Sequence, residues 1–314
     1  METKAVNTTA ELEKELGMSE QELFSFVEYH AEDAERIGYS EYSYWKSVFR
    51  NFLKNKAAVV MIIVFFAIFI FSFVALWIGK YDYQHLIPDT NLCFQSPNSE
   101  YWFGTDNLGR DYWCQVWYAT QTSIKLAAIV ALGECLMGVT IGCIWGYVRK
   151  ADRFFTELYN IFDSVPTMIY MTLIALFIGQ TFWIMCASII LFHWMYMAKN
   201  VRNLVFMYRD REYNLASRCL GTNLFRILTK NILPYLISVI ILRVALSIPS
   251  TIALETTLSY LGLGLDILLR NSRTFFLDYP YLLIFPAVIV SLVTITFYLA
   301  GNAFSDAADP RNHV

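Results

Sequence analysis

The stretch AAVVMIIVFFAIFIFSFVALWI, which runs from Ala57 to Ile78, decides the class of protein to which this chain belongs. Ser72 is its only polar residue. At about 1.5 Å per residue, a helix of this length crosses a bilayer core of about 30 Å. The whole chain of 314 residues agrees, because 56% of it is hydrophobic and only 16% is charged, unlike an ordinary soluble domain. The sequence therefore predicts a membrane protein.

Five further apolar segments follow, and together with the first they predict an all-α membrane protein with six spans. They cover residues 126–148, 155–178, 182–201, 235–263 and 281–303. The domain plan is an acidic extension (1–43), an amphipathic helix (44–56), the first span (57–78), an outer loop (79–125), a five-helix core (126–303) containing a polar loop at 202–234, and a tail (304–314).

Lysine and arginine gather in alternate connections between the spans, as they do in cytoplasmic loops of membrane proteins. The first 45 residues hold eleven acidic and three basic residues, a charge of −8, so the rest of the chain carries +5 within the total of −3. The basic connections contain Lys46, Arg50, Lys54, Lys56, Arg149, Lys150, Arg153, Arg202, Arg209, Arg211, Arg218, Arg226 and Lys230. Both termini are therefore predicted to be cytoplasmic.

Two helices are expected before the first span. The stretch 44–56 places Val48, Phe49, Phe52 and Leu53 on one helical face, opposite Arg50 and Lys54, which predicts a helix lying in the inner membrane interface. Further upstream, Ser19 and Glu22 have the spacing of a capping box for a short acidic helix. That N-terminal extension is expected to be a solvated appendage.

The segment EYNLASRCLGTNLFRILTKNILP, Glu212 to Pro234, interrupts the apolar pattern with two short predicted helices. Gly221 suits the left-handed position that ends the first helix, and Thr222 or Asn223 suits the cap of the second. A few hydrophilic residues would suffice to join two spans. A docking surface for a soluble partner and an anchor on anionic lipid are both compatible with this basic helical pair.

The same segment resembles the cytoplasmic "EAA" loop of the permeases of ABC importers, whose glycine and final Leu-Pro recur here as Gly221 and Leu233-Pro234. The resemblance implies that the loop seats in a cleft of an ATP-hydrolysing subunit and couples ATP use to the membrane helices. Leu215 stands where the family has Glu, and the two family alanines appear as Ala216 and Ser217. The candidate coupling residues are Leu215, Ala216, Ser217, Arg218, Gly221, Leu233 and Pro234.

Three further segments resemble the dipeptide, oligopeptide and nickel branch of these permeases. They are WFGTDNLGRDYW from Trp102, ADRFFTELYNIFDSVP from Ala151, and LETTLSYLGLG from Leu254. The chain is most similar to the second permease subunit of Gram-positive oligopeptide importers, which implies a type I ABC-importer permease fold. The segment LDILLRNSRTFFLDYP, before the last span, departs from the family pattern.

The resemblance also implies partners: a homologous permease, two cytoplasmic ATPase subunits and an extracellular, lipid-anchored peptide-binding protein. The chain has no GxxxxGK[ST] motif, because its only Gly-Lys pair, Gly79-Lys80, is followed by Tyr81. ATP and Mg²⁺ are therefore expected in the partner subunits, with no cofactor on this chain and no enzymatic activity of its own. The expected location is a bacterial, Gram-positive cell membrane.

Three ionisable residues fall within apolar spans, where each must face water or a partner because burial in lipid is costly. Glu134 and Arg243 either pair with each other or line the translocation path, and Glu255 either contributes to a gate or reaches the outer interface. His193, in the fourth span, has no acidic partner nearby in sequence and is expected to pack. Glycines every four residues, Gly138, Gly142 and Gly146, predict a close helix contact.

The outer-loop motif comprises Gly104, Thr105, Asp106, Gly109, Arg110 and Asp111. It either binds a partner protein or forms a turn in which Asp106 caps a helix leading to the second span. Cys93 and Cys114 lie in the same predicted loop, so a disulfide and two free thiols are both compatible with the sequence. The six cysteines show neither CxxC nor Cys/His spacing, so no metal site is predicted.

Three alternative functions stay open at this level. The same architecture would serve for dipeptides, nickel or another small solute, although few histidines lie in the spans. An ion-coupled carrier would instead use the membrane charges and work without an ATPase. A membrane sensor with the acidic N-terminus as its output is a third interpretation.

Overall fold

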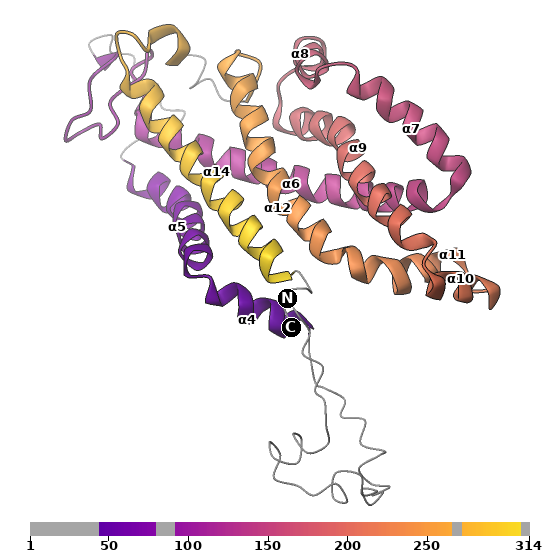
Figure 1. The fold of residues 1–314 in the computed structure, drawn as a ribbon. Coiled ribbons are helices and arrows are strands. Elements are labelled where there is room, and N and C mark those ends of the chain that lie inside the picture. Colours follow the sequence, from indigo (N-terminus) through magenta and orange to yellow (C-terminus); the bar gives the residue numbers. More distant parts are fainter. Residues whose placement is uncertain (1–43, 80–91, 266–271, 309–314) are drawn as a thin grey trace, which may run out of the picture. The chain divides into compact units, whose positions relative to one another are not determined.

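The computed structural model describes residues 44–79, 92–265 and 272–308, and from Ser47 onward the chain forms one compact unit (Figure 1). Helices dominate the described residues, where the only β pairing is an isolated bridge between Thr105 and Asp111. The helices are α4 (Tyr44–Lys54), α5 (Lys56–Ile78), α6 (Tyr112–Tyr147), α7 (Arg149–Asp163), α8 (Thr167–Phe177), α9 (Phe182–Arg209), α10 (Glu212–Cys219), α11 (Leu224–Arg226), α12 (Leu233–Tyr260) and α14 (Tyr281–Ala308). The acidic extension 1–43, with its predicted capping box, lies outside the described residues.

Five described helices are long and apolar enough to cross a membrane, counting Leu224–Tyr260 as one, and a bent pair, α7 with α8, brings the number to six. The chain is therefore a multi-pass membrane protein. The third span predicted at 155–178 corresponds to this bent pair and is not one straight helix, because α7 and α8 meet at an angle of 76°. Pro166 directly precedes α8 and is itself extended. A proline also disfavours the helical conformation at the residue before it, here Val165.

The second span begins earlier than predicted. Helix α6 starts at Tyr112, so the outer loop assigned to 79–125 ends at Asp111. Residues 112–125 contain aromatic and hydroxyl side chains that weaken the hydropathy signal, yet Tyr112, Val116 and Trp117 are buried in a cluster with α5 and α14. Tertiary packing of these aromatic residues extends the helix beyond its apolar segment.

Helices α6 and α9 form the central pair of the core (Figure 1). A Cβ atom added to Gly138 would lie 2.5 Å from Met197, and one added to Gly142 would lie 2.6 Å from the carbonyl oxygen of Ala198. At Gly146 it would lie 2.7 Å from the Arg202 carbonyl oxygen. The predicted close contact along this glycine ridge is confirmed, and its partner is α9.

Helix α4 is amphipathic as predicted, but the protein itself covers half of its apolar face. Val48 and Phe52 are buried, with the Phe52 ring 6.0 Å from that of Phe304, whereas Phe49 and Leu53 are exposed. The helix ends at Lys54, and Asn55 then caps α5 by accepting a hydrogen bond from the Ala58 amide. Placement in the membrane interface stays a prediction.

A π-helical turn, Ile227–Ile232, joins α11 to α12 and shows the wide i to i+5 hydrogen bonding of that form, for example from the Leu233 amide to the Leu228 carbonyl. Ile227 and Ile232 are fully buried beside Val201 and Val205 of α9. Helices α9 and α12 therefore extend into the segment assigned to the 202–234 loop, which is non-helical only around Asp210 and around Gly221. The fifth span predicted to begin at Tyr235 continues from Leu224.

The structure distinguishes the two alternatives left open for Cys93 and Cys114. Neither cysteine is in a disulfide, so the pairing is not formed. Cys114 is buried near the start of α6, whereas Cys219, at the end of α10, is exposed.

Candidate coupling surface and membrane pocket

Helix α10 ends in a glycine turn that points the chain back towards α12. Gly221 has φ +77°, its amide donates to the Arg218 carbonyl, and the Thr222 amide donates to the Ser217 carbonyl. These two bonds define a Schellman motif, whose left-handed position favours glycine. The predicted turn is confirmed, whereas Asn223 occupies the cap position of α11 without a side-chain hydrogen bond.

Large apolar side chains project from this helical pair into solvent. Leu220 is 86% exposed and Phe225 is 72% exposed, and Leu215, at the position of the family Glu, is 44% exposed. Ala216 is exposed as well, while Leu233 and Pro234 begin α12 beyond the π turn. Such a group of apolar side chains in a polar connection is typical of a protein interface.

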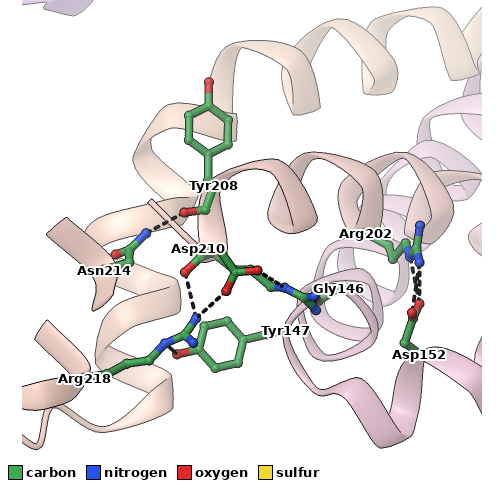
Figure 2. Close-up of polar contacts among 9 residues, drawn as sticks. Gly146, Tyr147, Asp152, Arg202, Tyr208, Asp210, Asn214 and Arg218 are labelled. Atoms are coloured by element: carbon green, nitrogen blue, oxygen red, sulfur yellow. Dashed lines mark hydrogen bonds and ion pairs between the residues drawn. The ribbon is translucent and has the colours of Figure 1, made fainter. Parts of the chain in front are cut away.

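Arg218 ties α10 to the ends of two core helices (Figure 2). Its Nε donates to the Tyr147 hydroxyl at 3.0 Å, and its Nη2 donates to the Arg209 carbonyl at 2.7 Å. Nη2 also lies 3.6 Å from an oxygen of the Asp210 carboxylate. Because Tyr147 ends α6 and Arg209 ends α9, one guanidinium group connects three helices.

Arg209 continues this connection into the core. Its side chain is only 8% exposed, its Nη1 donates to the Gly146 carbonyl at 3.0 Å, and its Nε lies 3.1 Å from the Asp210 carboxylate. The Gly146 carbonyl accepts this bond near the C-terminal end of α6, where the last carbonyls have no helical donors. The ends of α6 and α9 are thereby fixed to each other beside the glycine ridge.

Asn214 provides a second attachment of α10. It is fully buried, its Nδ2 donates to the Tyr208 carbonyl at 2.8 Å, and its Oδ1 accepts from Asn231 at 3.1 Å. Asn231 also donates to the Ser217 hydroxyl, and it lies in the π-helical turn. The sequence analysis missed Asn214, Asn231, Tyr147, Arg209 and Asp210. A polar residue on the inner side of a short amphipathic helix was the available signal for Asn214.

Arg202 and Asp152 join α9 to α7 further along the same side (Figure 2). Arg202 donates from Nε and Nη2 to the two carboxylate oxygens at 2.8 and 3.0 Å. Such a bidentate pair fixes orientation as well as distance. Asp152 lies in the segment ADRFFTELYNIFDSVP, which resembles the permease family. In this structure it forms a contact between α7 and α9.

The outer-loop motif satisfies most of its polar groups within itself. The Asp106 carboxylate accepts from the amides of Leu108 and Arg110 and pairs with the Arg110 guanidinium at 2.6 Å. Gly104 and Gly109 have φ +79° and +72°, and Thr105 accepts from the Gln95 amide. The turn interpretation is thus supported, and binding of a partner protein stays a prediction.

The predicted cap at Asp106 is wrong, because Asp111 caps α6. Its carboxylate accepts from the Trp113 amide at 3.0 Å, and a carboxylate in that place satisfies a helix amide without a helical partner. Burial raises the pKa of Asp111, and the hydrogen bonds from Trp113 and Cys114 oppose that shift.

Of the two alternatives for Glu134 and Arg243, the pairing with each other is not formed. Glu134 instead accepts from the Ser247 hydroxyl at 2.5 Å, and its other oxygen lies 3.2 Å from Nδ1 of His193. His193 therefore has an acidic neighbour, contrary to the expectation from sequence, because α6 brings Glu134 beside α9. Glu134, His193, Arg243 and Ser247 all line one cavity of about 360 Å³ between α6, α9 and α12.

Glu255 faces the bundle interior, as predicted for an ionisable residue in a span. Its carboxyl group is fully buried and accepts from Ser123 at 3.1 Å and from Ser259 at 2.6 Å. The side chain thus joins α12 to α6 and does not extend to the membrane interface. A role in a gate stays a prediction.

These helices define a multi-pass membrane protein, and comparison with known proteins identifies its family. The chain belongs to the binding-protein-dependent transport system inner membrane components, whose sequence model matches residues 138–314. A second model, the N-terminal TM domain of oligopeptide transport permease C, matches residues 43–97. The family expected from the motifs is confirmed.

Three characterised relatives are similar over nearly their whole length. The chain is 35% identical to the oligopeptide transport system permease protein AmiD of Streptococcus pneumoniae, with 94% of this chain and 98% of that protein covered. It is 32% identical to the oligopeptide transport system permease protein OppC of Bacillus subtilis, covering 90% and 94%. It is 30% identical to the dipeptide transport system permease protein DppC of Lactococcus lactis subsp. cremoris, again covering 90% and 94%.

Proposed function

We propose that this chain is one of two homologous permease subunits of an ATP-driven oligopeptide importer and supplies half of its translocation pathway. The proposed location is a bacterial, Gram-positive cell membrane with both chain termini in the cytoplasm. Two relatives named as oligopeptide permeases support the cargo, at 35% and 32% identity. ATP and Mg²⁺ would be bound by two cytoplasmic ATPase subunits, and an extracellular, lipid-anchored protein would deliver the peptide. The chain itself binds no cofactor and carries out no covalent chemistry.

The proposal depends chiefly on the surface formed by α10 and α11. Leu215, Leu220 and Phe225 expose apolar side chains, while Arg218 and Asn214 anchor their base to α6, α9 and the π turn. A cleft on an ATPase subunit would cover the exposed side chains and remove them from water. Movement of that cleft would then displace the anchored helices rather than bend a loose loop.

The alternative cargo, a dipeptide, has support from the 30% identity to a dipeptide permease. Uptake assays on the intact complex distinguish oligopeptide from dipeptide cargo when each peptide class is offered in turn at equal concentration. Preferential uptake of dipeptides would replace the oligopeptide assignment and leave the architecture unchanged. Nickel or another small solute as the main cargo would replace it in the same way.

The test is purification of the chain from its native membrane in mild detergent, followed by mass spectrometry of its stoichiometric partners. A second permease and two ATPase subunits are expected. In the Leu220→Ser variant, the ATPase subunits should be lost while the second permease remains. Leu277→Ser is the matched control, because Leu277 is 82% exposed and lies outside the α10–α11 surface.

Two results would contradict the proposal. One is equal retention of the ATPase subunits by Leu220→Ser and by the wild-type chain. The other is uptake by the chain alone, without ATP, in reconstituted vesicles. That second result would support an ion-coupled carrier that uses Glu134, Arg243 and Glu255.

A further inference from the structure

The cavity between α6, α9 and α12 carries a charged group with no partner among the described residues. Arg243 is exposed on its wall, and within the described parts of the chain it makes neither an ion pair nor a hydrogen bond. Arg243 lies near the middle of the apolar helical segment Leu224–Tyr260. A guanidinium within a membrane span is costly unless water or an anion meets it.

Glu134 lies in the same cavity but is already engaged by its neighbours. Its side chain is only 9% exposed, it accepts from Ser247, and His193 lies 3.2 Å from its Oε1. That oxygen nevertheless has no hydrogen bond of acceptable geometry among the described residues, because the short separation from His193 is poorly aligned. No hydrogen bond or ion pair joins Glu134 to Arg243 within the described residues.

Three polar side chains line the cavity with Arg243, and each already donates within the protein. The Ser247 hydroxyl donates to Glu134, the Ser250 hydroxyl to the Ser247 carbonyl, and Asn200 Nδ2 to the Tyr196 carbonyl. The guanidinium of Arg243, in contrast, has no acceptor among the described residues and is available to a ligand. A guanidinium group offers two parallel N–H donors, which match the two oxygens of a carboxylate. A carboxylate is the common anionic group of a peptide. A volume of about 360 Å³ is in the range of small-ligand sites and holds a terminal part of a peptide.

The geometry points to a subsite in the translocation pathway where Arg243 binds a carboxylate group of the cargo peptide. The C-terminal carboxylate and an acidic side chain are the two sources of that group. This inference depends on the proposed function, because it assigns the cavity to the path of a peptide. Glu134 and His193 line the same cavity, and neither forms an ion pair with Arg243 within the described residues.

The experiment uses the intact complex in vesicles, with its binding protein and ATP. Three hexapeptides are compared: one with a free carboxyl terminus, its C-terminal amide, and the amide with one internal glutamate. Each uptake rate is divided by the association constant of the isolated binding protein for that peptide. Selection by the binding protein then does not contribute to the comparison. Arg243→Gln, Arg243→Lys and the control Arg273→Gln are measured with the same set.

The wild-type complex should favour the free acid over the amide by about tenfold, the effect of one charge-assisted contact. Arg243→Gln should reduce this ratio to about one, while Arg243→Lys, which keeps the charge, should retain part of it. Arg273→Gln removes a guanidinium outside the cavity and should keep the wild-type ratio. Recovery of preference by the internal glutamate would identify a side-chain carboxylate as the source.

Equal losses of acid and amide uptake in Arg243→Gln would overturn the inference, and so would loss of the second permease from the purified variant. The latter result would assign Arg243 to a contact between subunits. Failure of the wild-type complex to take up any of the three peptides is a different outcome, because it contradicts the proposed function itself.

Discussion

At the scale of single residues, Arg218 is the contact on which transmission from α10 depends. Its guanidinium reaches Tyr147, the Arg209 carbonyl and Asp210, so Arg218→Gln removes the fork that connects α10 with α6 and α9. We expect ATP hydrolysis by the complex to persist while peptide uptake per ATP falls by about tenfold, as for loss of one or two hydrogen bonds to a charged group. Paired assays of phosphate release and uptake measure this ratio.

Arg149→Gln is the matched control for Arg218→Gln. Arg149 begins α7, outside the α10–α11 surface, is exposed, and forms no ion pair within the described residues. Its replacement should leave uptake per ATP unchanged. An equal fall in both variants would show that the net charge of the basic connections, rather than the contacts of Arg218, sets the coupling.

Glu255 is a second residue whose role can be measured. Glu255→Ala removes the acceptor for the Ser123 and Ser259 hydroxyls and leaves a cavity in a fully packed place. We expect the apparent melting temperature of the detergent-solubilised complex to fall by several degrees. Glu255→Gln keeps the shape of the side chain and one acceptor, so its melting temperature should lie near that of the wild type. A similar fall in both variants would indicate that the ionised form itself is required.

At the scale of helices, the α6–α9 contact sets how closely the core can pack. Gly142→Ala would bring a methyl group to 2.6 Å from the Ala198 carbonyl oxygen, and a backbone atom cannot move aside as a side chain does. Overpacking of this kind costs about 1–3 kcal/mol, more than the roughly 1 kcal/mol that alanine gains over glycine in a helix. Thermal unfolding in detergent should show a lower midpoint.

Gly301→Ala is the control for the glycine ridge. The added Cβ would lie 3.3 Å from the Ala245 Cβ, a contact that small movements relieve. Its melting temperature should equal or exceed that of the wild type. The opposite order of the two variants would mean that α6 and α9 separate freely, and that the ridge is not a fixed contact.

The helices also show how far the sequence alone could lead. Spans based on apolar length were predicted well, as for α5 and α14, because the signal is local composition. The break between α7 and α8 follows from Pro166, which an apolar average conceals. The early start of α6 and the neighbours of Glu134 depend on residues far away in the chain, so no local pattern contained them. The glycine turn of the coupling segment was predictable, whereas its anchors on α6 and α9 were not.

At the scale of the whole molecule, orientation can be measured through one native thiol. Cys219 is the exposed cysteine of the described structure and lies on α10. If α10 is cytoplasmic, a membrane-impermeant maleimide should label it in inside-out vesicles and leave it unmodified in intact cells. Labelling should also rise after peripheral proteins are washed away, because a docked ATPase subunit would cover this surface.

Other cysteines such as Cys93 are partly accessible, so the Cys219→Ser variant is needed to assign the label. The part of the labelling that disappears in this variant is the part on Cys219. Its appearance in intact cells would place α10 outside the cell and reverse the orientation inferred from lysine and arginine. Labelling unaffected by washing would speak against a partner on α10.

The π-helical turn at Ile227–Ile232 has a consequence for how the chain tolerates changes in length. An α-helix advances about 100° around its axis per residue, and a π turn accommodates one residue more than an α turn over the same rise. Removing one residue within this turn would therefore leave a regular helix, with α10 and the Arg243 face at their present angle to each other. Removing one residue from α12 between Pro234 and Arg243 would rotate the α10–α11 surface relative to Arg243 by about a quarter of a turn around the helix axis, away from its ATPase. The wide turn is thus a place in this helix where the loss of one residue leaves the angle between the two sites unchanged.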